Sequence, residues 1–400
     1  MSPSAKVVIA ARLSQEDRTF VATLKRLLEH KGFSSVTIAQ GDPASVRAEI
    51  EKLASRDTPI DAFVTIRAYE PFVSRIIEQF PTTEKKPVFA PPSYRWPTFL
   101  LTANLMNVAN QIVVIAIIAV GMTMVIITGG IDLSVGSLIA LSAVVAAWLI
   151  GKAGGVEVSG FALLLCSLAA IMLCGTIGAF SGFVITRFGL PPFIATLGVM
   201  QVASGFAYII SQGKPIYEIP DSYTWLGRGM TSPLSIPHAV LLMLLIYAVT
   251  HFMMSRTTLG RYIYAVGGNA EAARLSGVRV NLVLMFVYIT CGAMAGLGGI
   301  VMASQLKSGA PTYGLMYELY VIAAVVVGGT SLSGGEGRVM GTLIGAFIIA
   351  VIQNGMNLTN VESYTQKVVL GLVILGAVLL DMIKKRGLPR RRKKSVAAAQ

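Results

Sequence analysis

Charged residues are scarce in this chain of 400 residues, of which Lys, Arg, Asp and Glu make up only 13%. A typical soluble domain carries about a quarter. Hydrophobic residues account for 54% of the chain, and the mean hydropathy is +0.69. The scarcity is uneven, because 25 of the 53 charged side chains lie in residues 1 to 98. This composition argues against a water-soluble enzyme and separates a polar N-terminal quarter from an apolar remainder.

Cysteine and histidine are also rare, with three of each. The cysteines all lie inside apolar runs and form neither a disulfide framework nor a paired metal motif. The histidines are far apart in the sequence. We therefore expect no metal site and no catalytic cluster in this chain.

A phosphate-binding loop is missing as well. The motif G-x-x-x-x-G-K followed by Ser or Thr binds nucleotide phosphates through its backbone N–H groups and its lysine. Lys152 and Lys214 each follow a glycine, but neither has the earlier glycine or the following hydroxyl residue. The chain is therefore not expected to bind ATP.

Long apolar runs occupy the chain after residue 110. A membrane-spanning helix needs about 20 mostly apolar residues, and backbone inside lipid must form its hydrogen bonds within the segment. Nine runs approach that length: 112–128, 133–150, 161–186, 191–210, 237–254, 282–303, 319–333, 339–355 and 368–383. The sequence thus predicts an all-α polytopic membrane protein with about nine transmembrane helices.

Positive charge predicts the orientation of these helices, because short loops rich in Lys and Arg stay in the cytoplasm. Eight basic residues lie between Lys384 and Lys394, directly after the last run. We interpret them as a membrane-side anchor rather than a nucleic-acid site. The loop with Arg256, Arg261, Arg274 and Arg279 falls on the same side. Nine crossings then place the N-terminus outside; the alternative is that 133–150 does not cross and the N-terminus stays inside.

Residues 1–80 have the pattern of a small α/β unit. The expected strands are 6–13, 35–40 and 60–67, and the expected helices are 15–31, 44–56 and 71–80. Strands that alternate with helices at this spacing favour a parallel sheet. Residues 81–98 are rich in proline and are predicted to be a linker. The membrane domain follows at 99–385, and 386–400 is a basic cytoplasmic tail.

Glycines spaced four residues apart recur in the apolar runs, for example Gly178 with Gly182 and Gly292 with Gly296. Small residues on one helix face allow the close backbone approach that helices in lipid use for packing. These glycines predict a compact helical bundle and no mechanism of their own.

Asp132 is the most informative charge in the apolar region, because an acidic group at membrane depth is costly. It follows Gly129 and Gly130, and a similar pattern recurs 199 residues later at 328–335. Paired glycine-interrupted segments point to broken helices near a transport path, whereas Asp132 could equally cap a helix that starts at Leu133. The candidate path residues are Gly130, Asp132, Ser134, Gly329, Ser331 and Ser333.

The cytoplasmic loop 260–277 carries helix boundary signals. Asn269 can cap a short helix over 270–276, and Gly277 can end it. A short capped helix between two membrane spans is suited to docking on a partner protein.

Residues 104–385 resemble the ribose and xylose type of sugar permease of bacterial ABC importers, in the branched-chain amino acid and sugar permease superfamily. Four stretches carry the resemblance: AVGMTMVIITGGIDLSVGS at 119–137, PPFIATLG at 191–198, TTLGRYIYAVGGNAEAARLSGVRVN at 257–281 and IAAVVVGGTSLSGGEGRVMGTLIGA at 322–346.

The resemblance implies a permease subunit in the cytoplasmic (inner) membrane that moves a monosaccharide such as ribose. It implies as partners two ABC ATPase subunits that hydrolyse ATP, an extracytoplasmic sugar-binding protein and a second permease chain, most simply in a homodimer. It also implies that the loop is the coupling helix seated in a groove of the ATPase. The matching residues are Asn269, Glu271, Ala272, Ala273, Arg274, Leu275, Ser276 and Gly277.

The N-terminus departs from the family, whose members usually begin with a further transmembrane helix. The α/β unit in its place resembles the first lobe of a periplasmic sugar-binding protein. Two alternative functions stay open on the sequence alone. An ion-coupled secondary transporter would need several buried carboxylates, and only Asp132 lies near a span; a membrane-anchored sensor or enzyme would act through residues 1–98.

Overall fold

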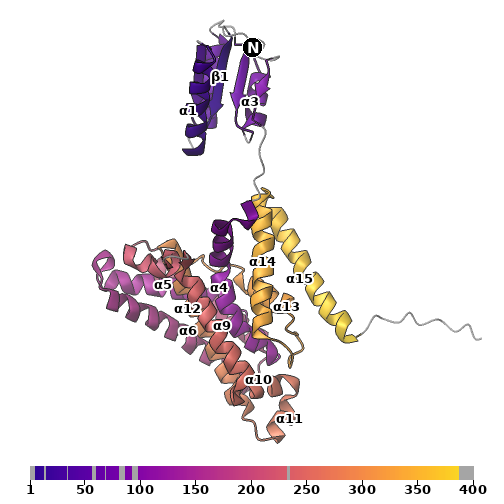
Figure 1. The fold of residues 1–400 in the computed structure, drawn as a ribbon. Helices are drawn as coiled ribbons and strands as arrows, with labels where there is room; N and C mark the ends of the chain where they lie inside the picture. The colour runs from indigo at the N-terminus through magenta and orange to yellow at the C-terminus, as the bar shows by residue number, and fades with distance from the viewer. Residues whose placement is uncertain are drawn as a thin grey trace, which may run out of the picture. The chain divides into compact units, whose positions relative to one another are not determined.

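The computed structural model describes residues 5–12, 15–33, 35–55, 60–67, 69–80, 86–91, 98–231 and 235–386. The chain divides into two compact units, Met1–Pro97 and Thr98–Gln400 (Figure 1). The first unit contains a parallel sheet with helices, and the second is a bundle of helices.

The N-terminal unit is the predicted parallel α/β structure. Its elements in chain order are β1 (Lys6–Ala11), α1 (Gln15–His30), β2 (Ser35–Gln40), α2 (Pro43–Ser55), β3 (Ala62–Thr65), α3 (Glu70–Ile77) and β4 (Val88–Phe89). The strands lie in the order β2-β1-β3-β4, and every neighbouring pair is parallel. Apolar residues of β1 and β3, such as Val8 and Phe63, are buried against Ile50 of α2 and Val73 of α3.

Strand β4 corrects the prediction that 81–98 is only a linker. Val88 is in register with Phe63 of β3, and the Phe63 N–H donates to the Pro87 carbonyl at 3.0 Å. Val88 is one of the partly buried residues that pack against the core of the unit. Pro87 does not prevent this pairing, because proline can occupy the start of an edge strand. Two apolar residues after it therefore extend the sheet. Most of the predicted linker, 81–85 and 92–97, lies outside the described residues.

Helices make up the second unit. The helices at the positions of the nine predicted apolar runs are α4 (Thr102–Ile127), α5 (Val135–Lys152), α6 (Gly160–Phe188), α7 (Pro192–Ser211), α9 (His238–Arg256), α12 (Val280–Leu306), α13 (Tyr317–Val327), α14 (Val339–Leu358) and α15 (Ser363–Arg386). Shorter elements are η1 (Thr98–Leu100), η2 (Gly155–Glu157), η3 (Asp221–Thr224), α8 (Trp225–Arg228), β5 (Met230–Thr231), β6 (Ile236–Pro237), α10 (Thr258–Gly268) and α11 (Ala270–Leu275).

Seven described helices are long and apolar enough to cross a membrane: α4, α5, α6, α7, α9, α12 and α14. The shorter apolar segments Tyr317–Val327 and Ser363–Leu379 occupy the positions of the other two predicted runs. The polytopic all-α class is therefore confirmed, whereas the predicted run 319–333 is too long, because α13 ends at Val327.

Helix α4 begins ten residues before the predicted run at 112, because its polar first turns have partners inside the bundle. Asn104 and Asn354 exchange two side-chain hydrogen bonds of 2.9 and 3.1 Å. The side-chain amide of Gln305 donates to the Asn110 carbonyl at 3.0 Å. On a hydropathy scale these asparagines are polar, so the predicted run starts only after them. Inside a protein, however, amides that pair with each other are stable.

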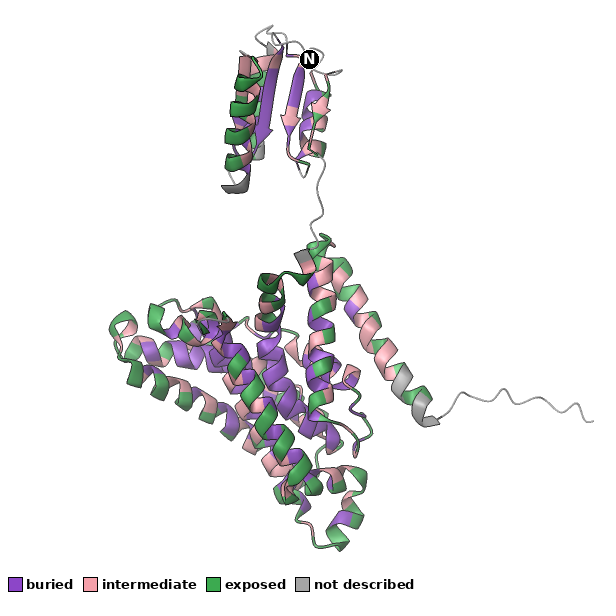
Figure 2. Ribbon diagram, in the orientation of Figure 1, coloured by how far each residue is buried: buried purple, intermediate pink, exposed green. Residues whose placement is uncertain are grey.

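Helix α4 is the core of the bundle and is buried along most of its length (Figure 2). The glycine pairs explain the close contact of α6 with α12. A Cβ at Gly178 would lie 2.3 Å from the Tyr288 carbonyl oxygen, and one at Gly292 would lie 2.4 Å from that of Cys174. The prediction that these glycines serve packing is confirmed.

The two ends of the bundle carry different structures. At one end the last residue of α4, Ile127, contacts α10 and the segment after α13. At the other end Asn104 pairs with the last turns of α14, and Ile216 and Gly309 exchange two backbone hydrogen bonds. Helix α5 runs between the two ends, which disfavours the alternative that 133–150 fails to cross. Because the basic loop with Arg256, Arg261, Arg274 and Arg279 is predicted to be cytoplasmic, we name the first the cytoplasmic end and the second the outer end.

We expect the N-terminal unit to lie on the outer side of the membrane, because α4 begins at the outer end. A cysteine at Leu27, which is 57% exposed, should react with a membrane-impermeant maleimide on intact spheroplasts. Cysteines at Tyr364 and Leu275 report the outer and cytoplasmic sides, and Cys166→Ala removes the partly exposed native thiol. Reaction at Tyr364→Cys without reaction at Leu27→Cys would place the unit inside.

Candidate functional site

The predicted short helix of the basic loop is present as α11. The Asn269 side chain accepts a hydrogen bond from the Ala272 N–H at 3.0 Å, which satisfies one of the free donors of the first turn. Gly277 ends the helix with φ +85°, a left-handed conformation that favours glycine. The predicted N-cap and the predicted helix end are both confirmed.

Helix α11 presents an exposed and partly apolar surface. Leu275 is 89% exposed, although leucine is usually buried in a protein without partners. Glu271 and Arg274 form an exposed ion pair at 3.4 Å, and Ala273 is the residue that faces inward. A rigid, capped turn with an exposed leucine between charged residues has the composition of a small docking surface.

Asp132 lies in the turn between α4 and α5 and is buried. Its Oδ1 accepts hydrogen bonds from the Ser134 N–H at 2.9 Å and the Ser134 hydroxyl at 2.6 Å. The Leu133 N–H instead donates to the Thr196 hydroxyl at 3.1 Å. Helix α5 begins at Val135 with Ser134 as its N-cap residue. The expectation that Asp132 caps a helix from Leu133 is therefore wrong, because its carboxylate closes a local turn one residue earlier.

The two glycine-interrupted segments have the same backbone geometry. The Gly129 and Gly130 N–H groups donate to the carbonyls of Ile126 and Val125, and Gly129 has φ +79°. After α13, the N–H groups of Gly329 and Thr330 donate to Val326 and Val325 in the same pattern, and Gly329 has φ +86°. Both are Schellman caps, which end a helix and satisfy its last carbonyls.

The turns that follow the two caps are also alike. The Ser331 hydroxyl accepts from the Ser333 N–H at 3.2 Å, as Asp132 accepts from Ser134. Asp132 and Ser331 are both buried, whereas Ser333 is exposed. The sequence match across 199 residues therefore reflects two similar helix ends, each followed by a turn that a side chain closes, although α5 begins at Val135 and α14 only at Val339. Gly130, Asp132 and Ser134 lie in one, and Gly329, Ser331 and Ser333 in the other.

The two turns meet each other and the end of α10. The Gly335 N–H donates to the Ile127 carbonyl at 2.8 Å, which joins the second turn to the last residue of α4. A Cβ at Gly267 of α10 would lie 1.7 Å from that carbonyl oxygen and 2.7 Å from the Gly335 nitrogen. We call this contact of Ile127, Gly267 and Gly335 the junction. It connects α10, and through Asn269 also α11, to two helix ends of the bundle.

A tyrosine reinforces the junction. The Tyr264 hydroxyl donates to the Gly337 carbonyl at 2.8 Å, one turn of α10 before Gly267. Burial raises the pKa of Tyr264 above its ordinary value, and the nearby charge of Arg338 opposes the rise. The phenol therefore stays protonated at neutral pH and keeps its donor.

Two polar groups beneath the first turn lack partners. Neither Asp132 Oδ2 nor the Tyr288 hydroxyl has a hydrogen-bond partner among the described residues. Tyr288 and Cys291 of α12 lie close to Asp132. No sequence pattern marks Tyr288 and Cys291, because they lie about 160 positions from the turn in an otherwise ordinary apolar helix.

A second carboxylate near a span was missed by the sequence analysis. Glu318 lies in the first turn of α13, and a Cβ at Gly136 of α5 would be 2.3 Å from its Oε2. The expectation that only Asp132 lies near a span is therefore wrong. The predicted run began at 319, one residue later, so Glu318 was assigned to a loop.

Substitution of Asp132 should separate hydrogen bonding from charge. We expect Asp132→Asn to keep the acceptor for Ser134 and the melting temperature, because Asp132 has no ion-pair partner among the residues described. Asp132→Leu should lower the free energy of unfolding by about 1 to 3 kcal/mol, since buried donors lose their acceptor. Thermal unfolding in detergent measures this, with Ser333→Ala as the exposed control. Loss of transport in Asp132→Asn at an unchanged melting temperature would instead assign a role to the charge.

Comparison with known proteins shows what this chain is similar to. The family described as branched-chain amino acid transport system / permease component matches residues 104–378. The ribose import permease protein RbsC of Escherichia coli K12 is 46% identical over 293 residues, which cover 72% of this chain and 88% of that protein. RbsC of Bacillus subtilis is 42% identical, with coverages of 72% and 87%. The D-allose transport system permease protein AlsC of E. coli K12 is 36% identical, with coverages of 71% and 85%. No solved structure matches the chain.

Proposed function

The chain belongs to the family of branched-chain amino acid transport system permease components, and from this membership we propose that it is the membrane-spanning permease subunit of an ATP-driven sugar importer. The observation that carries the proposal is the 46% identity to a ribose import permease over 88% of that protein's length. The seven long apolar helices fit a multi-pass protein of the cytoplasmic membrane. The N-terminal unit lies outside the matched region.

Ribose is the sugar that the comparisons favour. The two ribose permeases from distant bacteria are 46% and 42% identical to this chain, whereas the D-allose permease of E. coli is 36% identical. The chain is thus more similar to the ribose permeases of two different organisms than to the D-allose permease of one of them. This pattern supports ribose as the substrate. The ion-coupled transporter and the membrane-anchored sensor have no comparable support. For the ion-coupled transporter, Glu318 adds one carboxylate near a span.

Helix α11 is proposed as the surface that docks on the ATPase subunits. The helix has an exposed leucine and a capped, rigid turn, and it is connected to the junction. These features suit an element that transmits motion between an ATP-hydrolysing partner and the membrane helices. We propose that ATP is hydrolysed on the partner and that this chain acts without a catalytic residue, metal or cofactor of its own. The further partners proposed are an extracytoplasmic sugar-binding protein and a second copy of this chain.

The test is uptake in a bacterial strain that lacks its own ribose permease. This chain is expressed together with the ATPase and the binding protein of a ribose importer, and uptake of labelled ribose, allose and galactose is measured. We expect ATP-dependent uptake with ribose preferred. Uptake that persists with an ATPase variant unable to hydrolyse ATP would contradict the proposal and favour the ion-coupled alternative.

A further inference from the structure

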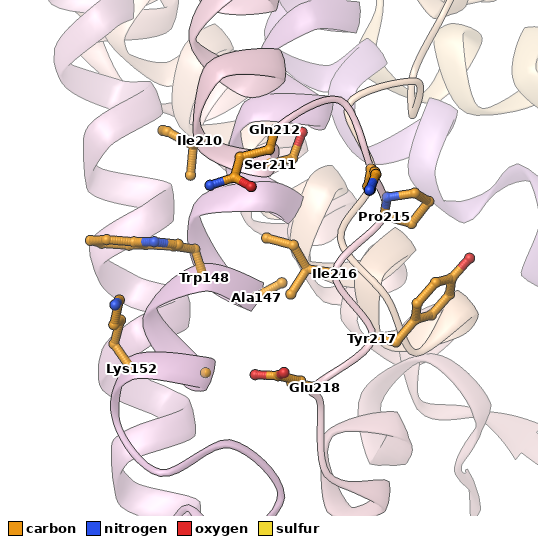
Figure 3. A pocket seen from close by; sticks show the side chains of 12 residues that line it. Ala147, Trp148, Lys152, Ile210, Ser211, Gln212, Pro215, Ile216, Tyr217 and Glu218 are labelled. Atoms are coloured by element: carbon orange, nitrogen blue, oxygen red, sulfur yellow. The ribbon is translucent and has the colours of Figure 1, made fainter.

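A pocket of about 550 Å³ lies at the outer end of the bundle, between the last turns of α5 and α7. The side chains that matter to its chemistry are those of Trp148, Lys152, Gln212, Lys214, Tyr217 and Glu218. Figure 3 shows Trp148 and Tyr217 at opposite edges of the space, with their rings directed away from each other and Ile216 between them, and Gln212 and Glu218 on the two remaining sides. Its volume is within the range of small-molecule sites in proteins, about 300 to 1,000 Å³.

Local backbone geometry creates the pocket. Helix α7 ends at Ser211, and Gln212 and Gly213 follow with φ of +52° and +72°, so that the chain turns sharply off the helix axis. Ile216 then exchanges two backbone hydrogen bonds with Gly309, of 2.8 and 2.9 Å. These bonds hold the segment 212–218 across the end of α5. Gly151 leaves the opposite wall open, since a Cβ there would be 3.3 Å from Glu218 Oε2.

The polar side chains of the pocket have no protein partners. The side chains of Lys152, Gln212, Lys214 and Glu218 form no hydrogen bond or ion pair within the described part of the chain. Asp221, three residues after Glu218, contrasts with them because it is paired with Lys307. Donors and acceptors thus converge on the pocket without satisfying one another.

This combination of groups suits an uncharged polyhydroxyl ligand. Aromatic rings pack against the C–H faces of a sugar ring, and carboxylate, amide and ammonium groups exchange hydrogen bonds with its hydroxyls. Two lysines beside one glutamate leave no single strong charge that would select an ion. A concave space lined by hydrogen-bonding groups fits a small ligand better than it fits the flat surface typical of protein docking.

The position of the pocket fits the entry of a substrate. Helix α5 has 18 residues and a length of about 27 Å at 1.5 Å per residue, and its other end is the turn of Asp132 near the junction. We propose that the pocket is an entry site that binds the transported monosaccharide on the outer side, with Gln212 and Glu218 exchanging hydrogen bonds with its hydroxyls and Trp148 as the apolar contact at its edge. This assignment rests on the proposed function of the chain as a sugar permease.

The test uses the complete transporter in proteoliposomes with Trp148→Ala and Glu218→Gln. Trp148 is 43% exposed and Glu218 is exposed, so that neither change removes a core contact. We expect each variant to lower the initial rate of ribose uptake by about tenfold, corresponding to about 1.4 kcal/mol. Co-purification of the ATPase and of the loaded binding protein should stay unchanged. Tyr364→Ala, an exposed aromatic outside the pocket, is the matched control and should keep full uptake.

The possible results separate the pocket from the proposed function. If the parent transporter carries ribose and both variants carry it equally well, the pocket assignment is overturned while the permease function stands. If uptake and capture of the binding protein fall together, the face is a docking surface and the sugar site is also overturned. If the parent chain carries no sugar at all, the proposed function itself fails.

Discussion

Gly267→Ala is expected to abolish sugar uptake while the protein remains in the membrane. A Cβ at this position would lie 1.7 Å from the Ile127 carbonyl oxygen and 2.7 Å from the Gly335 nitrogen, so the backbone must separate. Backbone cannot move aside as a flexible side chain does, and the hydrogen bond between Ile127 and Gly335 would be lost. The displaced α10 would carry α11 with it, which disconnects the proposed ATPase contact from the helix ends.

The neighbouring glycine supplies the control. A Cβ at Gly268 meets no atom within 4 Å, so Gly268→Ala makes the same chemical change on the same helix without a clash. We expect Gly268→Ala to transport ribose at the parental rate and Gly267→Ala to be at least about a hundredfold slower, equivalent to about 2.8 kcal/mol. Uptake and membrane content are measured for both. Equal uptake in the two variants would show that the junction does not transmit motion.

Leu275→Glu is expected to separate the permease from its ATPase. Leu275 is 89% exposed, so the substitution removes no internal contact, but it places a charge at the centre of the proposed docking surface. A charge buried in an interface without a partner costs several kcal/mol. We expect co-purification of the ATPase and ribose uptake to be lost together, with an unchanged melting temperature of the isolated permease.

A leucine on the segment before α13, outside the proposed docking surface, is the matched control for this variant. Leu315 is 75% exposed and precedes α13, far along the chain from α11. Leu315→Glu should retain the ATPase in co-purification. Retention of the ATPase by Leu275→Glu, or its loss from both variants, would contradict the assignment of α11 as the docking helix.

The features that could be predicted from the sequence are those that depend on residues close together in the chain. Asn269 and Gly277 marked the two ends of α11, and β2 was placed at its observed bounds, 35–40, from alternation and turn residues. The likeness of 129–136 and 328–335 also proved meaningful, because a Schellman cap depends on a glycine at one position of one turn. In each case the determining atoms lie within about six residues of one another.

Contacts between distant segments could not be predicted in this way. Hydropathy placed the start of α4 at 112 because Asn104 finds its partner 250 residues later. The sequence also marked Gly267 only as one glycine among 40, since its close neighbours, Ile127 and Gly335, come from two other parts of the chain. The expected cap by Asp132 failed only in part through such a contact, because the Leu133 N–H donates to Thr196 of α7. The Asp132 carboxylate itself accepts from Ser134 in a local turn, and α5 begins at Val135.

The hydrogen bond between Ile127 and Gly335 also orders the biogenesis of the protein. A ribosome makes Ile127 and Gly267 long before it makes Gly335, so a chain that has just completed α12 has α11 but no closed junction. Contacts of such long sequence separation form late, once the intervening segments are inserted. We therefore expect α11, the proposed contact with the ATPase, to reach its final position only after α13 has entered the membrane. If α11 docks on the ATPase as proposed, the ATPase should bind only chains that are almost completely synthesised.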